Sequence, residues 1–99
     1  MNHFGEHIKN LRLKRNLLQR QLAALLETDT AFISKLEKGD KRASREQVIK
    51  MAAFFNISQD DLLSLWLGEK VYDVLKNEVM AKKALKVAEK KINYDSVKK

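Results

Sequence analysis

Residues 18–39, LQRQLAALLETDTAFISKLEKG, decide the fold. Apolar residues recur there at spacings of three and four, which predicts two short amphipathic helices, over residues 19–26 and 30–37, joined by a tight turn at 27–29. Asp29 is well placed to cap the second helix, because its carboxylate can accept a hydrogen bond from a first-turn amide. The side chains that meet inside this corner are Leu22, Ala23, Leu26, Ile33 and Leu36.

The outward face of the second helix is short, polar and basic. Such a helix suits the major groove of DNA, which admits one α-helix and presents base edges to polar and cationic side chains. Lysine can donate to guanine, a hydroxyl can bond either way, and an alanine methyl group can contact a thymine methyl group. The predicted base contacts are Thr30, Ala31, Ser34 and Lys35, and the predicted DNA-backbone contacts are Gln19, Arg20, Lys38, Lys41 and Arg42.

This segment resembles the helix-turn-helix of the phage-repressor, or Xre-type, family, and FISKLEKG at residues 32–39 is similar to that family's commonest recognition-helix ending. The resemblance implies an all-α fold, with a five-helix lambda-repressor-like domain over 1–63 and a C-terminal helical extension over 64–99. It also implies that Arg12 and Glu37 form a structural pair and do not contact DNA. Two residues depart from the family pattern, because Leu18 replaces a Ser or Thr cap and Glu27 replaces a frequent turn glycine.

The remaining helices are predicted from their apolar stripes and caps. The first covers residues 3–15, and the fourth begins at a capping box made by Ser44 and Gln47. A fifth helix begins near Ser58 and closes the core. A last helix spans 78–92, and the basic residues 93–99 are expected to be frayed.

Residues 65–75, LWLGEKVYDVL, hold more large apolar groups than a small domain with a filled core can bury. Three roles are open for this cluster: part of the core, a seam between two copies of the chain, or a binding face for another protein. The seam is the favoured interpretation. Its predicted dimerisation residues are Leu65, Trp66, Val71, Tyr72 and Leu75.

Composition narrows the classes of function. The net charge of +7 suits a polyanionic partner. The lack of cysteine excludes disulfides and thiolate metal sites, and fits a reducing cytoplasm. No apolar run is long enough for a signal peptide or a membrane span. His3 and His7 share a helical face but lack further ligands, so no metal site is predicted.

The sequence shows no nucleophile paired with a base and no phosphate-binding glycine loop, so we expect neither enzymatic activity nor a cofactor. The function hypothesis is a cytoplasmic, sequence-specific transcriptional regulator that binds a partly palindromic double-stranded DNA site as a homodimer and blocks or recruits polymerase. The layout resembles restriction-modification controller proteins as well as phage repressors, and shows no small-molecule effector pocket. The alternative hypothesis is an antitoxin that regulates its own gene and binds a toxin through its C-terminal helices.

Overall fold

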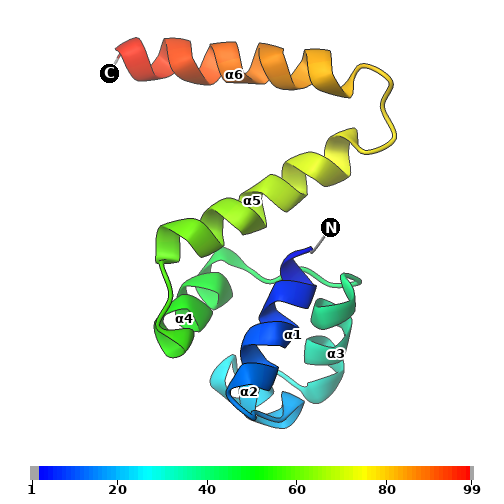
Figure 1. Cartoon of the computed structure of the whole chain (residues 1–99), viewed down its shortest axis with the longest axis vertical. Helices are drawn as coiled ribbons and strands as arrows, with labels where there is room; N and C mark the ends of the chain where they lie inside the picture. The colour runs from blue at the N-terminus through cyan, green and yellow to red at the C-terminus, as the bar shows by residue number, and fades with distance from the viewer. Residues whose placement is uncertain (1–2, 99) are drawn as a thin grey trace. The chain divides into compact units, whose positions relative to one another are not determined.

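The computed structural model describes residues 3–98, which form six helices and no strand. The domain was expected to contain five helices, and the sixth belongs to the C-terminal part of the chain (Figure 1). The helices are α1 (Phe4–Lys14), α2 (Gln19–Leu25), α3 (Thr30–Lys38), α4 (Arg45–Phe55), α5 (Gln59–Leu75) and α6 (Ala81–Lys98).

Local sequence signals set the limits of the first four helices. Asp29 caps α3 by accepting a 2.7 Å hydrogen bond from the amide of Phe32, and Gly39 ends this helix in the left-handed conformation with φ of 88°. The predicted capping box of Ser44 and Gln47 begins α4, with bonds of 2.9 and 3.1 Å. Because most of these signals are local, the predicted and observed helices agree to within about two residues at these ends.

The weaker cap expected at Leu18 is supported by a neighbouring side chain. Leucine has no acceptor, and the structure gives it no capping hydrogen bond of its own. The Gln21 side chain instead accepts a 2.7 Å hydrogen bond from the Leu18 amide, which is half of a capping box. At the other end of α2, Glu27 occupies the position where the family often has glycine, and it adopts the left-handed conformation with φ of 56°. This conformation costs a residue other than glycine about 1 kcal/mol.

One hydrophobic core lies among α1 to α5, and α3 packs against both α1 and α2 (Figure 1). Its largest fully buried side chains are Ile8, Leu22, Ile33, Leu36, Val48, Met51 and Leu62. The close approach of α1 to α3 depends on Gly5, because a Cβ atom at this position would lie 2.0 Å from the backbone oxygen of Leu36. The position of α3 is therefore fixed by backbone packing as well as by its apolar face.

Trp66 belongs to this core, so its predicted place in a dimer seam is wrong. Its side chain is only 5% exposed, and its ring nitrogen donates a 2.8 Å hydrogen bond to the carbonyl of Ala43. The guanidinium of Arg45 covers the ring at 5.4 Å from its centroid. The chain needs no partner to bury its tryptophan, because the loop before α4 and the α5 helix provide the pocket.

The described chain divides into two compact units, one ending at Glu69 and the other beginning at Lys70. The division falls inside α5, which continues through Gly68 without a break. In the second unit, α6 extends to Lys98, whereas residues from 93 onward were expected to be frayed. None of the described helices combines the length and the apolar character that crossing a membrane requires.

Candidate nucleic-acid interface

Helix α3 has two faces of opposite character. Ile33, Leu36 and Glu37 are buried against the rest of the domain. The side chains of Thr30, Ala31 and Lys35 are exposed, and Ser34 is half-buried. At about 100° per residue, the four predicted base-contacting residues fall within one continuous arc of about 140°. The structure therefore brings these four predicted site residues together on a single accessible face.

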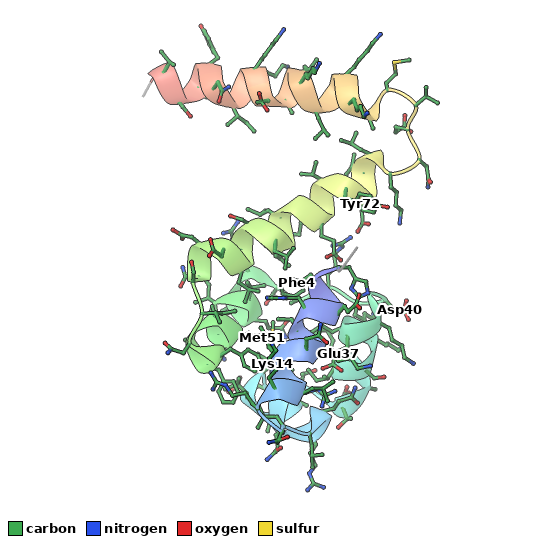
Figure 2. The ribbon with its side chains drawn as sticks, in the orientation of Figure 1. Phe4, Lys14, Glu37, Asp40, Met51 and Tyr72 are labelled. Carbon is green, nitrogen blue, oxygen red and sulfur yellow. The ribbon has the colours of Figure 1, made fainter. Side chains whose placement is uncertain are left out.

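A buried ionic network holds α3 against α1. The Arg12 guanidinium donates to both carboxylate oxygens of Glu37, at 2.7 and 3.0 Å, and its third nitrogen donates to the carbonyl of Leu17 at 2.7 Å. Both charged residues are less than a tenth exposed. Figure 2 shows Glu37 on the side of α3 that faces α1. The pair implied by the family resemblance is therefore present, and its role is to orient α3.

Gln19 completes this network from the first turn of α2. Its side-chain nitrogen donates a 3.0 Å hydrogen bond to the Glu37 carboxylate, so one of its two N–H groups is committed inside the protein. Gln19 was predicted to contact the DNA backbone, and this bond within the protein was not foreseen. One feature of the sequence could have indicated this bond. When Arg12 pairs with Glu37, the Glu37 carboxylate can still accept a further hydrogen bond, and it lies close to the start of α2.

Four of the predicted DNA-backbone contacts are exposed cationic side chains around α3. Arg20 lies on α2, Lys38 lies in the last turn of α3, and Lys41 and Arg42 follow in the loop. The amides of Asp40 and Lys41 fold back onto the carbonyl of Lys35, at 2.8 and 3.3 Å. This loop therefore lies against the end of the helix that carries the candidate base contacts.

A shallow hollow connects the loop with the first turns of α3. It is lined by Thr28, Asp29, Ala31, Phe32, Lys35 and Lys41. Phe32 is partly buried against the core. Lys35 and Lys41 consequently supply positive charge at one hollow, one from the helix and one from the loop.

The remaining predicted site residues lie outside this face. Leu65 is half-buried against the core, and Leu75 is half-buried in the second unit. Val71 and Tyr72 are exposed, at 46% and 58%. Within residues 3–98, no group of three His, Cys, Asp or Glu side chains is arranged to hold a metal ion.

Comparisons with known proteins agree with this geometry. The family model described as Helix-turn-helix matches residues 8–62. The HTH-type transcriptional activator BcrR of Enterococcus faecalis is 35% identical over 75 residues, which cover 76% of this chain and 35% of that protein. The matched part of this chain thus spans only about a third of its curated relative.

Solved structures of the clp gene regulator ClgR from Corynebacterium glutamicum share the fold. One has a TM-score of 0.55 and 20% identity, covering 86% of this chain and 88% of the ClgR chain. The other has a TM-score of 0.53 and 24% identity, covering 67% and 86%. At these identities, the likeness concerns the fold alone.

Proposed function

This chain belongs to the Xre-type, lambda-repressor-like helix-turn-helix family of DNA-binding transcription regulators, and we propose that it binds a partly palindromic double-stranded DNA operator as a homodimer. The observation that carries this proposal is the two-sided character of α3. Its inner face is locked by Arg12 and Glu37, while its outer face presents Thr30, Ala31 and Lys35 to solvent.

The proposed mechanism separates reading from positioning. The outer face of α3 enters the major groove, where Lys35 donates to guanine and the hydroxyls of Thr30 and Ser34 bond base edges. The cationic side chains of Arg20, Lys38, Lys41 and Arg42, together with the remaining N–H group of Gln19, bind phosphates and set the register. Two copies present their α3 helices about 34 Å apart, in successive major grooves.

A homodimer is supported by the apolar side chains that the second unit leaves exposed. With Trp66 in the core, the proposed seam residues in this unit are the exposed Val71 and Tyr72 and the half-buried Leu75. Val74 lies beside them and is 75% exposed. The antitoxin alternative places a different protein on the same residues. Size-exclusion chromatography with light scattering distinguishes the two hypotheses. The homodimer hypothesis predicts the mass of a dimer for the purified chain alone, whereas the antitoxin alternative predicts a monomer until the toxin binds.

The decisive experiment is selection of binding sites from a random pool of double-stranded DNA. We expect an enriched site with two related halves separated by about one helical turn. Enrichment without symmetry would contradict the dimer, and no enrichment would contradict sequence-specific binding. A promoter reporter carrying the selected site then distinguishes repression from activation. Activation is the activity that the name of BcrR describes.

Lys35→Ala tests the assignment of the reading face. We expect it to abolish preference for the selected site while leaving weak binding that depends on salt, because the remaining cations still contact phosphates. Lys50→Ala on α4 is the matched control, since it removes an exposed lysine from another helix. Sequence preference that survives Lys35→Ala, measured by fluorescence anisotropy with selected and scrambled DNA, would show that α3 is not the reader.

Lys41→Ala tests the positioning role of the loop. We expect similar weakening on selected and scrambled DNA, and a salt dependence reduced by about one unit of slope, because one phosphate contact is lost. A loss confined to one base pair of the selected site would instead make Lys41 a reader.

A further inference from the structure

Helix α6 carries a narrow apolar stripe that is exposed to solvent. Along it, Leu85 is 46% exposed and Ile92 is 63% exposed. The stripe consists of Ala81, Ala84, Leu85, Ala88 and Ile92, and the lysines around it are Lys82, Lys83, Lys86, Lys90 and Lys91. A helix with one apolar stripe gains stability by burying that stripe against another surface.

The spacing and size of the stripe residues favour a second helix as that surface. Ala81, Leu85, Ala88 and Ile92 alternate steps of four and three, which is the seam of a two-helix coiled coil. Alanines let two helix backbones approach closely, but they supply little apolar area for insertion into a lipid surface. A second helix therefore fits the stripe better than a membrane does.

A parallel pair of α6 helices is disfavoured by charge. In that orientation each seam residue meets its own copy, and the next position of the seam is Asp95. Two aspartates would then face each other inside the seam, at the cost of like-charge repulsion. The flanking positions add no opposite-charge contact that could offset this repulsion, because Ala84 would lie beside Glu89 of the second copy.

Within the four apolar layers, an antiparallel pair makes the packing complementary and adds opposite charges on one flank. Ala81 then lies opposite the second copy's Ile92, and Leu85 opposite its Ala88, so that each large side chain meets a small one. On one flank, Lys82 lies beside Glu89 of the second copy, and the two-fold axis repeats this contact. Asp95 falls beyond the last apolar layer, where the register places it opposite Glu78 of the second copy, in the loop before α6 and outside the helical seam.

We propose that α6 pairs with α6 of a second copy as an antiparallel two-helix seam, in the register that places Ala81 opposite Ile92. This inference rests on the homodimer of the proposed function and adds a contact between two α6 helices to its proposed seam at Val71, Tyr72 and Leu75. Four layers form a small contact, so we expect association in the micromolar range, at the low end for specific interfaces.

Cysteine cross-linking of the full chain tests the orientation, because the chain has no cysteine of its own. Ala81→Cys and Ile92→Cys variants are purified separately, mixed and oxidised. Antiparallel pairing predicts a disulfide between the two different variants. It predicts none between two copies of one variant, because equal positions are separated by about 16 Å along the axis, beyond the reach of a disulfide. Lys83→Cys, on the outer face of the predicted pair, is the control for random collision.

Charge reversal tests the register by sedimentation equilibrium. Lys82→Glu or Glu89→Lys alone turns both flanking contacts into like-charge contacts, so we expect the dissociation constant to rise by about fivefold. Mixing the two variants restores opposite charges at both contacts, so heterodimers should form in preference to either homodimer. Lys83→Glu makes the same change of net charge outside the seam, and we expect it to leave the dissociation constant nearly unchanged.

Four outcomes would overturn the inference. Disulfides between two copies of one variant would show a parallel pair. A dimer that neither cross-links nor responds to charge reversal would place the seam elsewhere and leave the proposed homodimer standing. A monomer would overturn both the pairing and the homodimer, while the DNA selection still tests DNA binding on its own. Binding of the monomer to phosphatidylglycerol vesicles, lost in a Leu85→Glu variant, would assign the stripe to a lipid surface.

Discussion

Replacing Arg12 with methionine removes one half of the buried ion pair that orients α3. Arg12 currently donates to Glu37 through two nitrogens and to the carbonyl of Leu17 through the third. After the change, the Glu37 carboxylate stays buried with only the Gln19 side chain to solvate it. Breaking a buried pair in this way costs about 3–5 kcal/mol, because the remaining charge is uncompensated. This is a large share of the roughly 5–15 kcal/mol that stabilises a typical domain.

The assay is urea unfolding followed through Trp66. The chain has one tryptophan, and it is buried in the domain core, so its fluorescence reports unfolding of the same unit. A loss of 3–5 kcal/mol should move the midpoint downward by about 2 M or more for a small domain. If Arg12→Met leaves too little folded protein, Arg12→Lys keeps the charge without the planar fork and should give a smaller loss.

The double variant Arg12→Met/Glu37→Met separates the pair from its two charges. With no unpaired charge left, we expect it to be more stable than either single variant, because replacing a whole buried ion pair by apolar groups is often nearly neutral. The reasoning would be refuted if each single change lowered the free energy of unfolding by less than about 1 kcal/mol and the double variant lost the sum of the two. Additive losses are expected of sites that do not interact.

Four further changes test local features of the fold by urea unfolding. Glu27→Gly should raise the free energy of unfolding by about 0.5–1 kcal/mol, because glycine accepts the left-handed conformation that glutamate adopts there; a loss of stability would contradict this. Gly68→Ala should raise it by up to about 1 kcal/mol, since no atom lies within 4 Å of the added methyl group and the helix is continuous. Gly5→Ala is its opposite, and we expect a loss of about 3 kcal/mol from overpacking; equal effects of the two glycines would refute both. Trp66→Phe, followed by circular dichroism, should cost about 1–3 kcal/mol, because the Ala43 carbonyl loses its donor; an unchanged midpoint would show that this bond contributes nothing.

Local signals explain which parts of the fold were predictable from the sequence. The ends of α3 followed from Asp29 and Gly39, and the start of α4 followed from the capping box of Ser44 and Gln47. The ion pair of Arg12 with Glu37 was implied by the family resemblance, whereas the third member, Gln19, was missed. Its role depends on how α1, α2 and α3 meet, which the spacing within one helix does not encode.

The place of Trp66 was mispredicted for a related reason. Its pocket is completed by the Ala43 carbonyl and the Arg45 side chain, more than twenty residues earlier in the chain. A cluster of apolar residues after an apparently complete core therefore looked unpartnered. Gly68 does not interrupt α5, because a glycine costs a helix only about 1 kcal/mol.

Because Trp66 lies in the core, it is not available to bind a second copy of the chain. In the proposed homodimer, other residues must form the contact between the two copies. One bidentate contact to a base pair discriminates by about 1–3 kcal/mol, whereas specific sites are typically bound more tightly than random DNA by about 4–10 kcal/mol. The short face formed by Thr30, Ala31, Ser34 and Lys35 gives one copy only the lower part of that range. In the proposed homodimer a second copy doubles the number of readers, and with Trp66 buried we propose that exposed apolar residues within 71–97 recruit it. The specificity of the proposed dimer for DNA therefore depends on the exposed apolar residues of the second unit. Variants that dissociate the α6 pair should lose operator preference even though every residue of α3 is unchanged.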